Sequence, residues 1–262
     1  MTKQKLRILF ALTAAFNPND GGVQRTTYKL GTYFTEHGLN VAYYSCSDKG
    51  HINDYAGKLY TAQDNTGISR NKAALQAAIS NFRPDIVVNQ MPYEKELTNI
   101  LFDLKFKHKY WLIGCLRNSL FSVISNLRAT SKQVLPSYIF PLLDNEAGLY
   151  LLKLLHKRKH RRALIEILKK HDRYILLAPP NEKELRYFVG FFMADKVTAI
   201  PNSIPQVSKK IPKKDKIILH VGRLNTTQKR SDLLVPFWKA CYNSLPDWKF
   251  IIVGDGPYRE ML

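Results

Sequence analysis

"LRILFALTAAFNPNDGGVQRTTYKLGTYFTEHG", residues 6–38, contains a complete strand, turn and helix in chain order. The apolar run at 6–12 is typical of a short buried strand. The turn ends in Gly21–Gly22, and the helical pattern after it stops at Gly38, which suits the residue just beyond a helix C-cap. "NVAYYS" (40–45) predicts the next strand, so the chain opens with a strand–helix–strand unit.

The same alternation continues along most of the chain. Further strands are predicted at "DIVVNQ" (85–90), "YWLIGCL" (110–116), "RYILLA" (173–178) and "KVTAI" (196–200), and helices at 68–82, near 93–106 and from Pro180 to Gly190. Short apolar strands that alternate with helices are typical of parallel strands joined by helical crossovers. We therefore predict an α/β fold, with a doubly wound Rossmann-like N-terminal domain over 1–202.

A second domain is predicted after a break in the pattern. Residues 203–215 are rich in Pro and Lys with little to bury, which is typical of an interdomain linker. The alternation restarts with a buried strand at 217–221, a helix near 229–243, a strand at 248–254 and a helix opening in "DGPYREML". Because a doubly wound sheet needs about 100 residues or more to cover both faces, we interpret 216–262 as an incomplete second Rossmann-like domain.

The charge of the chain predicts an anionic partner. Its 40 Lys and Arg against 21 Asp and Glu give a formal net charge of +19 over 262 residues. Nucleic acid, an anionic membrane face and phosphorylated substrates all fit such an excess. No apolar run approaches the roughly 18 residues of a membrane-spanning helix. Three widely spaced cysteines match no zinc or redox spacing and favour a cytoplasmic location.

The N-terminal residues also resemble a signal peptide, because basic residues precede the first apolar run. That run is short and contains Thr13, so we interpret it as the first strand instead.

Three loops stand where doubly wound sheets bind ligands, at the carboxyl ends of strands. Gly21 and Gly22 permit close backbone approach before a helix N-terminus, which is an anion-binding arrangement or a plain turn. Gly254 and Gly256 follow the last predicted strand in the same way. No dinucleotide-binding GxGxxG pattern and no P-loop occurs.

The third loop carries two cations, Arg223 and Lys229, directly after Gly222. A planar guanidinium and a compact ammonium together suit a diphosphate. If that diphosphate is a leaving group, fixed cations stabilise the transition state more than the ground state. A solvated basic loop is the alternative interpretation.

Two C-terminal stretches carry a resemblance to a known family. "VGRLNTTQKRSDLL" (221–234) followed by "FIIVGDGPYRE" (250–260) resembles the donor-domain signature of family 4 glycosyltransferases, which have the GT-B fold. "RPDIVV" and "VTAIPNSI" fall where that family has its N-terminal motifs and domain junction. The resemblance implies transfer of a hexose from a nucleotide-diphosphate sugar, with retention at the anomeric carbon and without a metal or other cofactor.

The resemblance also implies roles for individual residues. Arg223 and Lys229 match the family's diphosphate-binding pair, with Gly222, Gly254 and Gly256 in the same motifs, and Gly21 and Gly22 match its glycine loop toward the donor phosphates. Arg117, beside Asn118, stands where the family often has a His facing the donor sugar and acceptor. The family's pair of Glu separated by seven residues is absent up to Leu262, so we do not expect the chain alone to turn over.

The absence of a DxD triplet fits the implied metal-free reaction. "DNE" (144–146) is the nearest candidate for a metal-binding pair, and we interpret it as a solvated loop.

The segment 151–173 is dense in Lys and Arg and carries leucines at helical spacing. Such a helix can lie on an anionic bilayer. It can equally pack its leucines on the domain and leave its charges in water, and the pattern does not separate the two. We interpret His156 and His160, four residues apart within it, as a solvated pair rather than metal ligands.

The leading hypothesis is a cytoplasmic glycosyltransferase of cell-surface polysaccharide synthesis, peripheral on the inner face of the plasma membrane. Its partners would be a nucleotide sugar and a glycan or lipid-linked saccharide acceptor. The alternatives are a basic nucleic-acid- or membrane-binding protein without catalysis, a sugar-nucleotide epimerase of the same fold, and a catalytically silent scaffold. No helix-turn-helix, RRM or KH pattern occurs, so we expect no specific nucleic-acid partner.

Overall fold

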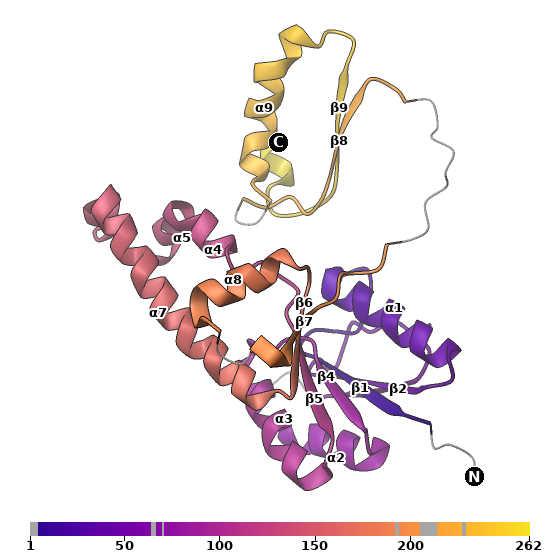
Figure 1. Cartoon of the computed structure of the whole chain (residues 1–262). Coiled ribbons are helices and arrows are strands. Elements are labelled where there is room, and N and C mark those ends of the chain that lie inside the picture. The colour runs from indigo at the N-terminus through magenta and orange to yellow at the C-terminus, as the bar shows by residue number, and fades with distance from the viewer. Residues whose placement is uncertain (1–4, 64–66, 70, 192–193, 205–213, 227–228) are drawn as a thin grey trace. The chain divides into compact units, whose positions relative to one another are not determined.

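A computed structural model describes residues 5–63, 67–69, 71–191, 194–204, 214–226 and 229–262 of the chain. It divides into two compact units (Figure 1). The first unit comprises Met1–Ser125 and Asn145–Ile204, and the second comprises Asn126–Asp144 and Pro205–Leu262. Most of the predicted linker, residues 205–213, lies outside the described residues.

The first unit is built on a seven-stranded sheet in which every pairing is parallel. The strand order is β3-β2-β1-β4-β5-β6-β7. The strands are β1 (Arg7–Leu12), β2 (Asn40–Ser45), β3 (Lys58–Thr61), β4 (Ile86–Asn89), β5 (Trp111–Cys115), β6 (Arg173–Leu176) and β7 (Val197–Ala199). The predicted α/β fold with a doubly wound parallel sheet is confirmed.

Helices cover the two faces of this sheet unequally. On one face lies α1 (Gly22–Glu36), whose half-buried Leu30 and Phe34 pack over Phe10 and Val88. The opposite face is covered by α2 (Lys72–Phe82), α3 (Lys95–His108), α7 (Glu146–Lys170) and α8 (Pro180–Val189). The short α4 (Ser122–Ser125) and the 3-10 turn η1 (Ala194–Lys196) complete the unit.

The end of α1 and the start of α8 lie where a glycine and a proline predicted them. Gly38 takes a φ of 80° two residues after α1, a left-handed conformation that glycine adopts without strain. Pro180 occupies the first position of α8, where its missing N–H is not needed.

Strand β3 was not predicted from the sequence. It has only four residues, three of them half-buried, at the edge of the sheet. It is preceded by Gly57, where a Cβ atom would lie 2.4 Å from the carbonyl oxygen of Val41. The close approach of the two backbones, rather than an apolar pattern, therefore places this strand beside β2.

The second unit contains a pair of parallel strands, β8 (Ile217–Val221) and β9 (Lys249–Val253). Helix α9 (Leu234–Cys241) packs on them through Phe237 and Trp238, whose rings lie 5.7 and 5.6 Å from the ring of Phe250. The unit also includes α5 (Leu127–Val134), α6 (Phe140–Leu143), η2 (Ser231–Leu233), η3 (Tyr242–Ser244) and η4 (Arg259–Met261).

Two expectations for this unit were wrong. Strand β8 is not buried on both faces, since Leu219 and Val221 are 58% and 68% exposed. The physical reason is that α9 packs on the face of the strand pair that carries Phe250. The residues that alternate with that face, among them Leu219 and Val253, stay exposed. The helix expected in "DGPYREML" is only the short 3-10 turn η4.

His171 joins three elements of the first unit through polar contacts in its core. Its ring is 1% exposed, and Nδ1 donates to the carbonyl oxygen of Ile167 at 2.7 Å. Nε2 then accepts from the Asn89 amide at 3.3 Å, and that amide also donates to Thr98 Oγ1 at 2.9 Å. Burial lowers the pKa of His171 to about 4. Only the neutral ring fits, because a proton on Nε2 would face the amide donor.

This network predicts a pH-dependent stability. An unfolded His has its ordinary pKa of 6.5, so the contribution of His171 is complete above that pH and is lost as the pH falls toward about 4. Between pH about 7 and about 4.5 the expected loss is about 2.5 kcal/mol. Urea unfolding at several pH values should show a weaker pH dependence for His171→Gln than for the wild type. The exposed His37→Gln variant is the control, and equal slopes for all three proteins would contradict the assignment.

Candidate functional site

The carboxyl edge of the seven-stranded sheet contains a topological switch point. The chain proceeds outward from β1 through β2 to β3, and then outward on the other side from β4 to β7. The loops after β1 and β4 therefore diverge, and doubly wound sheets bind ligands at this position.

Gly21 and Gly22 lie at this switch point, where α1 begins. Gly21 is the N-cap residue of α1, and no acidic side chain occupies the first turn of the helix. A Cβ atom on Gly22 would meet nothing within 4 Å, so the backbone at Gly22 faces open space, whereas one on Gly21 would lie 3.0 Å from Gln24 Oε1. The first amides and the positive end of the helix dipole can therefore receive an anion.

Arg117 connects the ends of several strands at the same edge. Its Nε donates to Gln90 Oε1 at 3.2 Å, and its Nη1 donates to Asn202 Oδ1 at 3.1 Å. Thr26 of α1 donates to the same Asn202 oxygen at 3.5 Å. Gln90 is buried, and its Nε2 has no partner among the residues described. The cluster therefore offers a guanidinium, an amide and a hydroxyl at the carboxyl edge of the sheet.

The loop after β5 is held by one carboxylate. Glu184 of α8 accepts from the Ser119 hydroxyl at 3.0 Å and from the backbone N–H groups of Leu120 and Phe121 at 2.6 and 3.3 Å. Asn118, at the start of this loop, is exposed. Sequence reasoning missed Gln90, Asn202 and Glu184, although Gln90 is the last residue of a predicted strand and Asn202 lies two residues after another.

A cavity of about 360 Å³ lies beside the cluster, against the face of the sheet that carries α1. Arg117, Thr26 and Asn202 border it, but most of its lining is apolar: Ile8, Phe10, Leu30, Phe34, Ile86, Val88, Ile113, Cys115, Ile175 and Ile200. Such a lining does not suit the sugar or the phosphates of a nucleotide sugar. The polar groups that border the cavity, Arg117, Thr26 and Asn202, are those of the cluster at the carboxyl edge.

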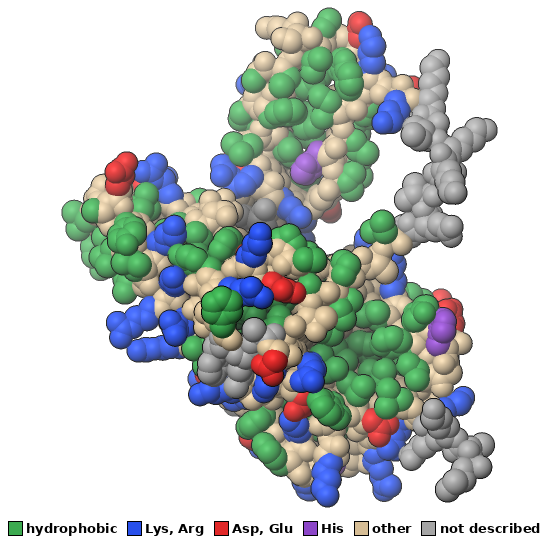
Figure 2. All heavy atoms as spheres, viewed as in Figure 1, with side chains coloured by type: hydrophobic (Ala, Val, Ile, Leu, Met, Phe, Trp, Pro, Cys, Tyr) green, Lys and Arg blue, Asp and Glu red, His purple; other side chains and the backbone are tan. Residues whose placement is uncertain are grey.

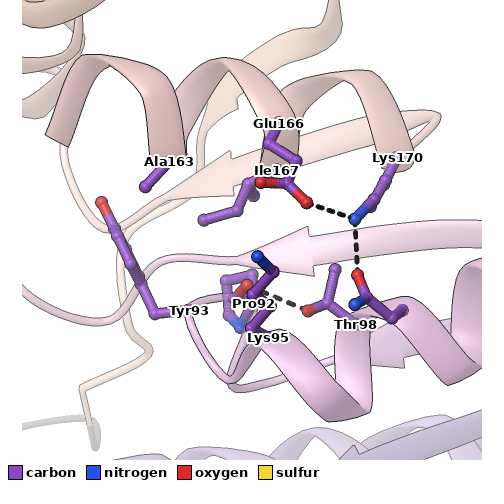
Figure 3. Close-up of a pocket in the computed structure, with 9 residues that line it drawn as sticks. Pro92, Tyr93, Lys95, Thr98, Ala163, Glu166, Ile167 and Lys170 are labelled. Carbon is purple, nitrogen blue, oxygen red and sulfur yellow. Dashed lines mark hydrogen bonds and ion pairs between the residues drawn. The ribbon is translucent and has the colours of Figure 1, made fainter. Parts of the chain in front are cut away.

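A second pocket, between α3 and α7, is about 70 Å³ in volume (Figure 3). Glu166 and Lys170 of α7 form an ion pair of 2.6 Å at its rim, and Lys170 also donates to Asn99 of α3. Tyr93 and Pro92 close its other side. The pocket is too small for a sugar, and these contacts join the two helices.

In the second unit, the loop after β8 is bonded to the loop after β9. Gly222 donates to the carbonyl oxygen of Val253 at 3.0 Å, and Leu224 donates to that of Asp255 at 2.8 Å. The Leu224 carbonyl accepts from Tyr258 at 3.1 Å. These bonds prolong the pairing of the strands into the loops that carry the predicted cations.

Asn225 sets the path of the cationic loop. Its side-chain oxygen accepts from the backbone N–H of Lys229 at 2.9 Å, and its carbonyl accepts from Ser231 at 3.0 Å. Arg223 and Lys229 are both exposed on the loop so formed. Residues 227–228 lie outside the described part. The neighbouring Arg230 pairs instead with Asp232 at 2.8 Å, and this contact lowers the pKa of the Asp232 carboxyl.

Gly254 and Gly256 allow the two loops to meet. A Cβ atom on Gly254 would lie 1.9 Å from the carbonyl oxygen of Gly222, and one on Gly256 would lie 2.4 Å from that of Leu224. The close approach seen here is therefore between two backbones of the same unit. It places Gly222 and Arg223 firmly at the carboxyl end of β8.

The remaining candidates for metal binding have other partners. Asp144 pairs with Arg128 at 2.6 Å, and the Asn145 side chain caps α7. Among the described residues no group of three His, Cys, Asp or Glu side chains could hold a metal ion.

The interpretation of the two histidines as solvated was wrong. His156 and His160 are half-buried, with their rings 4.0 Å apart and both facing Phe188 of α8. Burial lowers the pKa of His156 to about 4, with a further contribution from His160.

The backbone contact at Gly254 predicts a large effect of one methyl group. Gly254→Ala would drive Cβ into the Gly222 carbonyl, a rigid backbone atom, and should destabilise the second unit by about 2 kcal/mol or more. Unfolding followed by Trp fluorescence would measure the loss, with Trp111 of the first unit replaced by Phe in every variant so that the signal comes from Trp238 and Trp248. Gly22→Ala, where the added atom meets open space, is the matched control. Wild-type stability in Gly254→Ala would contradict the contact.

Comparison with solved structures shows what the chain resembles. It aligns with sucrose-phosphate synthase from Thermosynechococcus elongatus at a TM-score of 0.65 and 13% identity, covering 97% of this chain and 64% of that one. It aligns with S. aureus TarM, in a complex with fondaparinux, alpha-GlcNAc-glycerol and UDP, at a TM-score of 0.65 and 12% identity, covering 98% and 73%. Starch synthase IV from Arabidopsis thaliana, bound to ADP and acarbose, gives 0.55 and 12%, covering 97% and 69%.

These proteins are glycosyltransferases with the GT-B fold, and the chain shares their Rossmann-like architecture. It spans 64% of the length of the sucrose-phosphate synthase chain. No family model matches the sequence, and no curated protein does so either.

Proposed function

We propose that the protein is a glycosyltransferase that moves a hexose from a nucleotide-diphosphate sugar to an acceptor. The observation that carries this proposal is the loop after β8. It presents Arg223 and Lys229 at the carboxyl end of a parallel strand, and Asn225 and the β9 loop fix its backbone. The fold shared with glycosyltransferases supports the same assignment.

In the proposed reaction, the nucleotide diphosphate leaves as its bond to the sugar breaks. Negative charge then grows on the bridging oxygen, and Arg223 and Lys229 stabilise it. Because the loop is held before the substrate arrives, its cations cost little reorganisation at the moment of bond cleavage. Gly222 allows the chain to turn directly after β8, and Gly254 and Gly256 keep the neighbouring loop close.

The first unit would supply the contacts for phosphate and acceptor. We assign the open N-terminus of α1 at Gly21–Gly22 to donor phosphate, because its amides and dipole favour an anion. We assign Arg117 and Asn118 to the acceptor side. Arg117 stands in a polar cluster with Gln90 and Asn202, whose amides and carbonyls match sugar hydroxyls.

We further infer a family 4 enzyme that retains the anomeric configuration. The motifs at 221–234 and 250–260 support the family, and retention is the outcome that the family resemblance implies. A glycan or lipid-linked saccharide of cell-surface polysaccharide synthesis is the proposed acceptor. TarM, one of the similar structures, was solved with alpha-GlcNAc-glycerol and UDP.

Arg223 and Lys229 form the proposed diphosphate clamp, and their removal predicts a loss of nucleotide affinity. Replacing Arg223 and Lys229 together by Gln should weaken the binding of UDP or ADP by about 100-fold, because two charge-assisted contacts to the diphosphate are lost. Isothermal titration calorimetry with both nucleotides would measure the change.

The control for this variant removes the same charge elsewhere in the unit. Lys239→Gln with Lys249→Gln alters an exposed residue of α9 and the first residue of β9, at the strand end away from the loop. It should bind as the wild type does. Equal affinity in the clamp variant would contradict the assignment, and so would tighter binding of duplex DNA than of either nucleotide.

The same clamp predicts that binding needs no divalent ion. If Arg223 and Lys229 supply the positive charge, EDTA should leave the affinity for UDP or ADP unchanged within about 2-fold. Calorimetric titrations with EDTA and with added Mg²⁺ would test this. An affinity that falls 10-fold or more on chelation would contradict the metal-free proposal.

A further inference from the structure

Helix α7 has two different halves. In its C-terminal half, Leu164, Ile167 and Leu168 are buried in the core together with Phe188 of α8. In its N-terminal half, Leu151, Leu154 and Leu155 remain 48%, 44% and 55% exposed. The leucines of this helix therefore do not all pack on the domain, as one interpretation of the sequence required.

The inner face of α7 is fixed along its length by contacts. His156 and His160 face Phe188, and Lys157 lies with its Nζ 4.0 Å over the ring of Tyr187. Near the end of the helix, Lys170 donates to Asn99 of α3 and is also paired with Glu166 of its own helix (Figure 3). The helix is therefore anchored, and its rotation about its own axis is set.

The outer face carries leucines and arginines in one line. Leu151, Leu155, Arg158 and Arg162 recur at intervals of four, three and four residues, so they share one side of the helix. Leu154 and Arg161 flank this line, and all six residues are exposed. We call these six residues the α7 outer face. Figure 2 shows hydrophobic and basic side chains together on the surface where Figure 1 draws α7.

We propose that the α7 outer face docks the protein on an anionic lipid bilayer. The helix lies along the membrane surface, with its leucines at the boundary of the acyl chains and its arginines on lipid phosphates. Three guanidinium groups beside three exposed leucines complement such a surface in both charge and polarity. Nucleic acid would contact the arginines and leave the leucines in water. The effect of replacing the leucines therefore distinguishes binding to a bilayer from binding to nucleic acid.

Docking of this kind is peripheral. None of the helices in the described part of the chain combines the length and apolar composition that a membrane crossing requires. The proposal is independent of nucleotide-sugar binding, because the α7 outer face shares no residue with the cationic loop after β8. A result that contradicts membrane docking therefore does not contradict nucleotide-sugar binding, and the reverse also holds.

Vesicle flotation tests the proposal on the whole chain without any sugar donor. Vesicles of phosphatidylglycerol and phosphatidylcholine in equal parts should bind the wild type, whereas pure phosphatidylcholine should not. Replacing Arg158, Arg161 and Arg162 by Gln should weaken binding by about 100-fold, because each basic residue near an anionic surface contributes about fivefold and the three factors multiply. Replacing Leu151 and Leu155 by Gln should weaken it on the order of 10-fold.

A matched variant separates location from net charge. Lys29, Lys72 and Lys107 are exposed on α1, α2 and α3, and their replacement by Gln removes the same charge. This variant should float as the wild type does, and circular dichroism would show that all variants are folded. The proposal is overturned if the wild type does not float, if the matched variant loses as much binding, or if the leucine variant binds like the wild type.

Discussion

The parallel direction of all seven strands in the first unit is the constraint on which the candidate site depends. In a parallel sheet, every loop that follows a strand emerges at the same edge. Helix α1 and the loops after β4, β5 and β7 are far apart in the chain, yet Thr26, Gln90, Arg117 and Asn202 form one hydrogen-bonded cluster there. The second unit repeats the arrangement on a smaller scale, since β8 and β9 are parallel and their loops bond to each other. In both units, the parallel direction of the strands brings the candidate polar and charged residues to one edge of the sheet.

Much of the fold could be predicted because its signals are local. The strand at 7–12, the helix after Gly22 and the residue beyond its C-cap, Gly38, are all encoded within neighbouring residues. The burial of β8 could not be predicted in the same way. Ile217, Leu219 and Val221 are apolar, but burial depends on what packs against them, and α9 contacts the other face of the strand pair, at Phe250. Apolar composition thus predicts that a strand forms, but it does not predict which elements pack against that strand.

The site was predictable in part for the same reason. Gly21, Gly22, Arg223 and Lys229 follow strands in sequence, so their place at a carboxyl edge could be inferred residue by residue. The partners of Arg117 could not, because Gln90 is 27 positions away and Asn202 is 85. Such contacts require the strand order β4-β5-β6-β7, which no local pattern contains. Glu184 was missed for a related reason, since it acts on a loop 63–65 positions earlier.

The excess positive charge of the chain has at least two physically different surroundings. On the β8 loop, the backbone around Arg223 and Lys229 is held by Asn225 and by the β9 loop, which suits a small anion of defined shape. On α7, the exposed arginines stand in line with exposed leucines, on a helix whose opposite face is anchored by His156, His160 and Lys157. Charged side chains on a loop of fixed backbone favour a ligand whose shape matches their positions. Charged side chains that alternate with apolar ones along a helix favour an extended surface that is both charged and apolar. The net charge of +19 therefore does not imply a single anionic partner, because its parts stand in physically different surroundings.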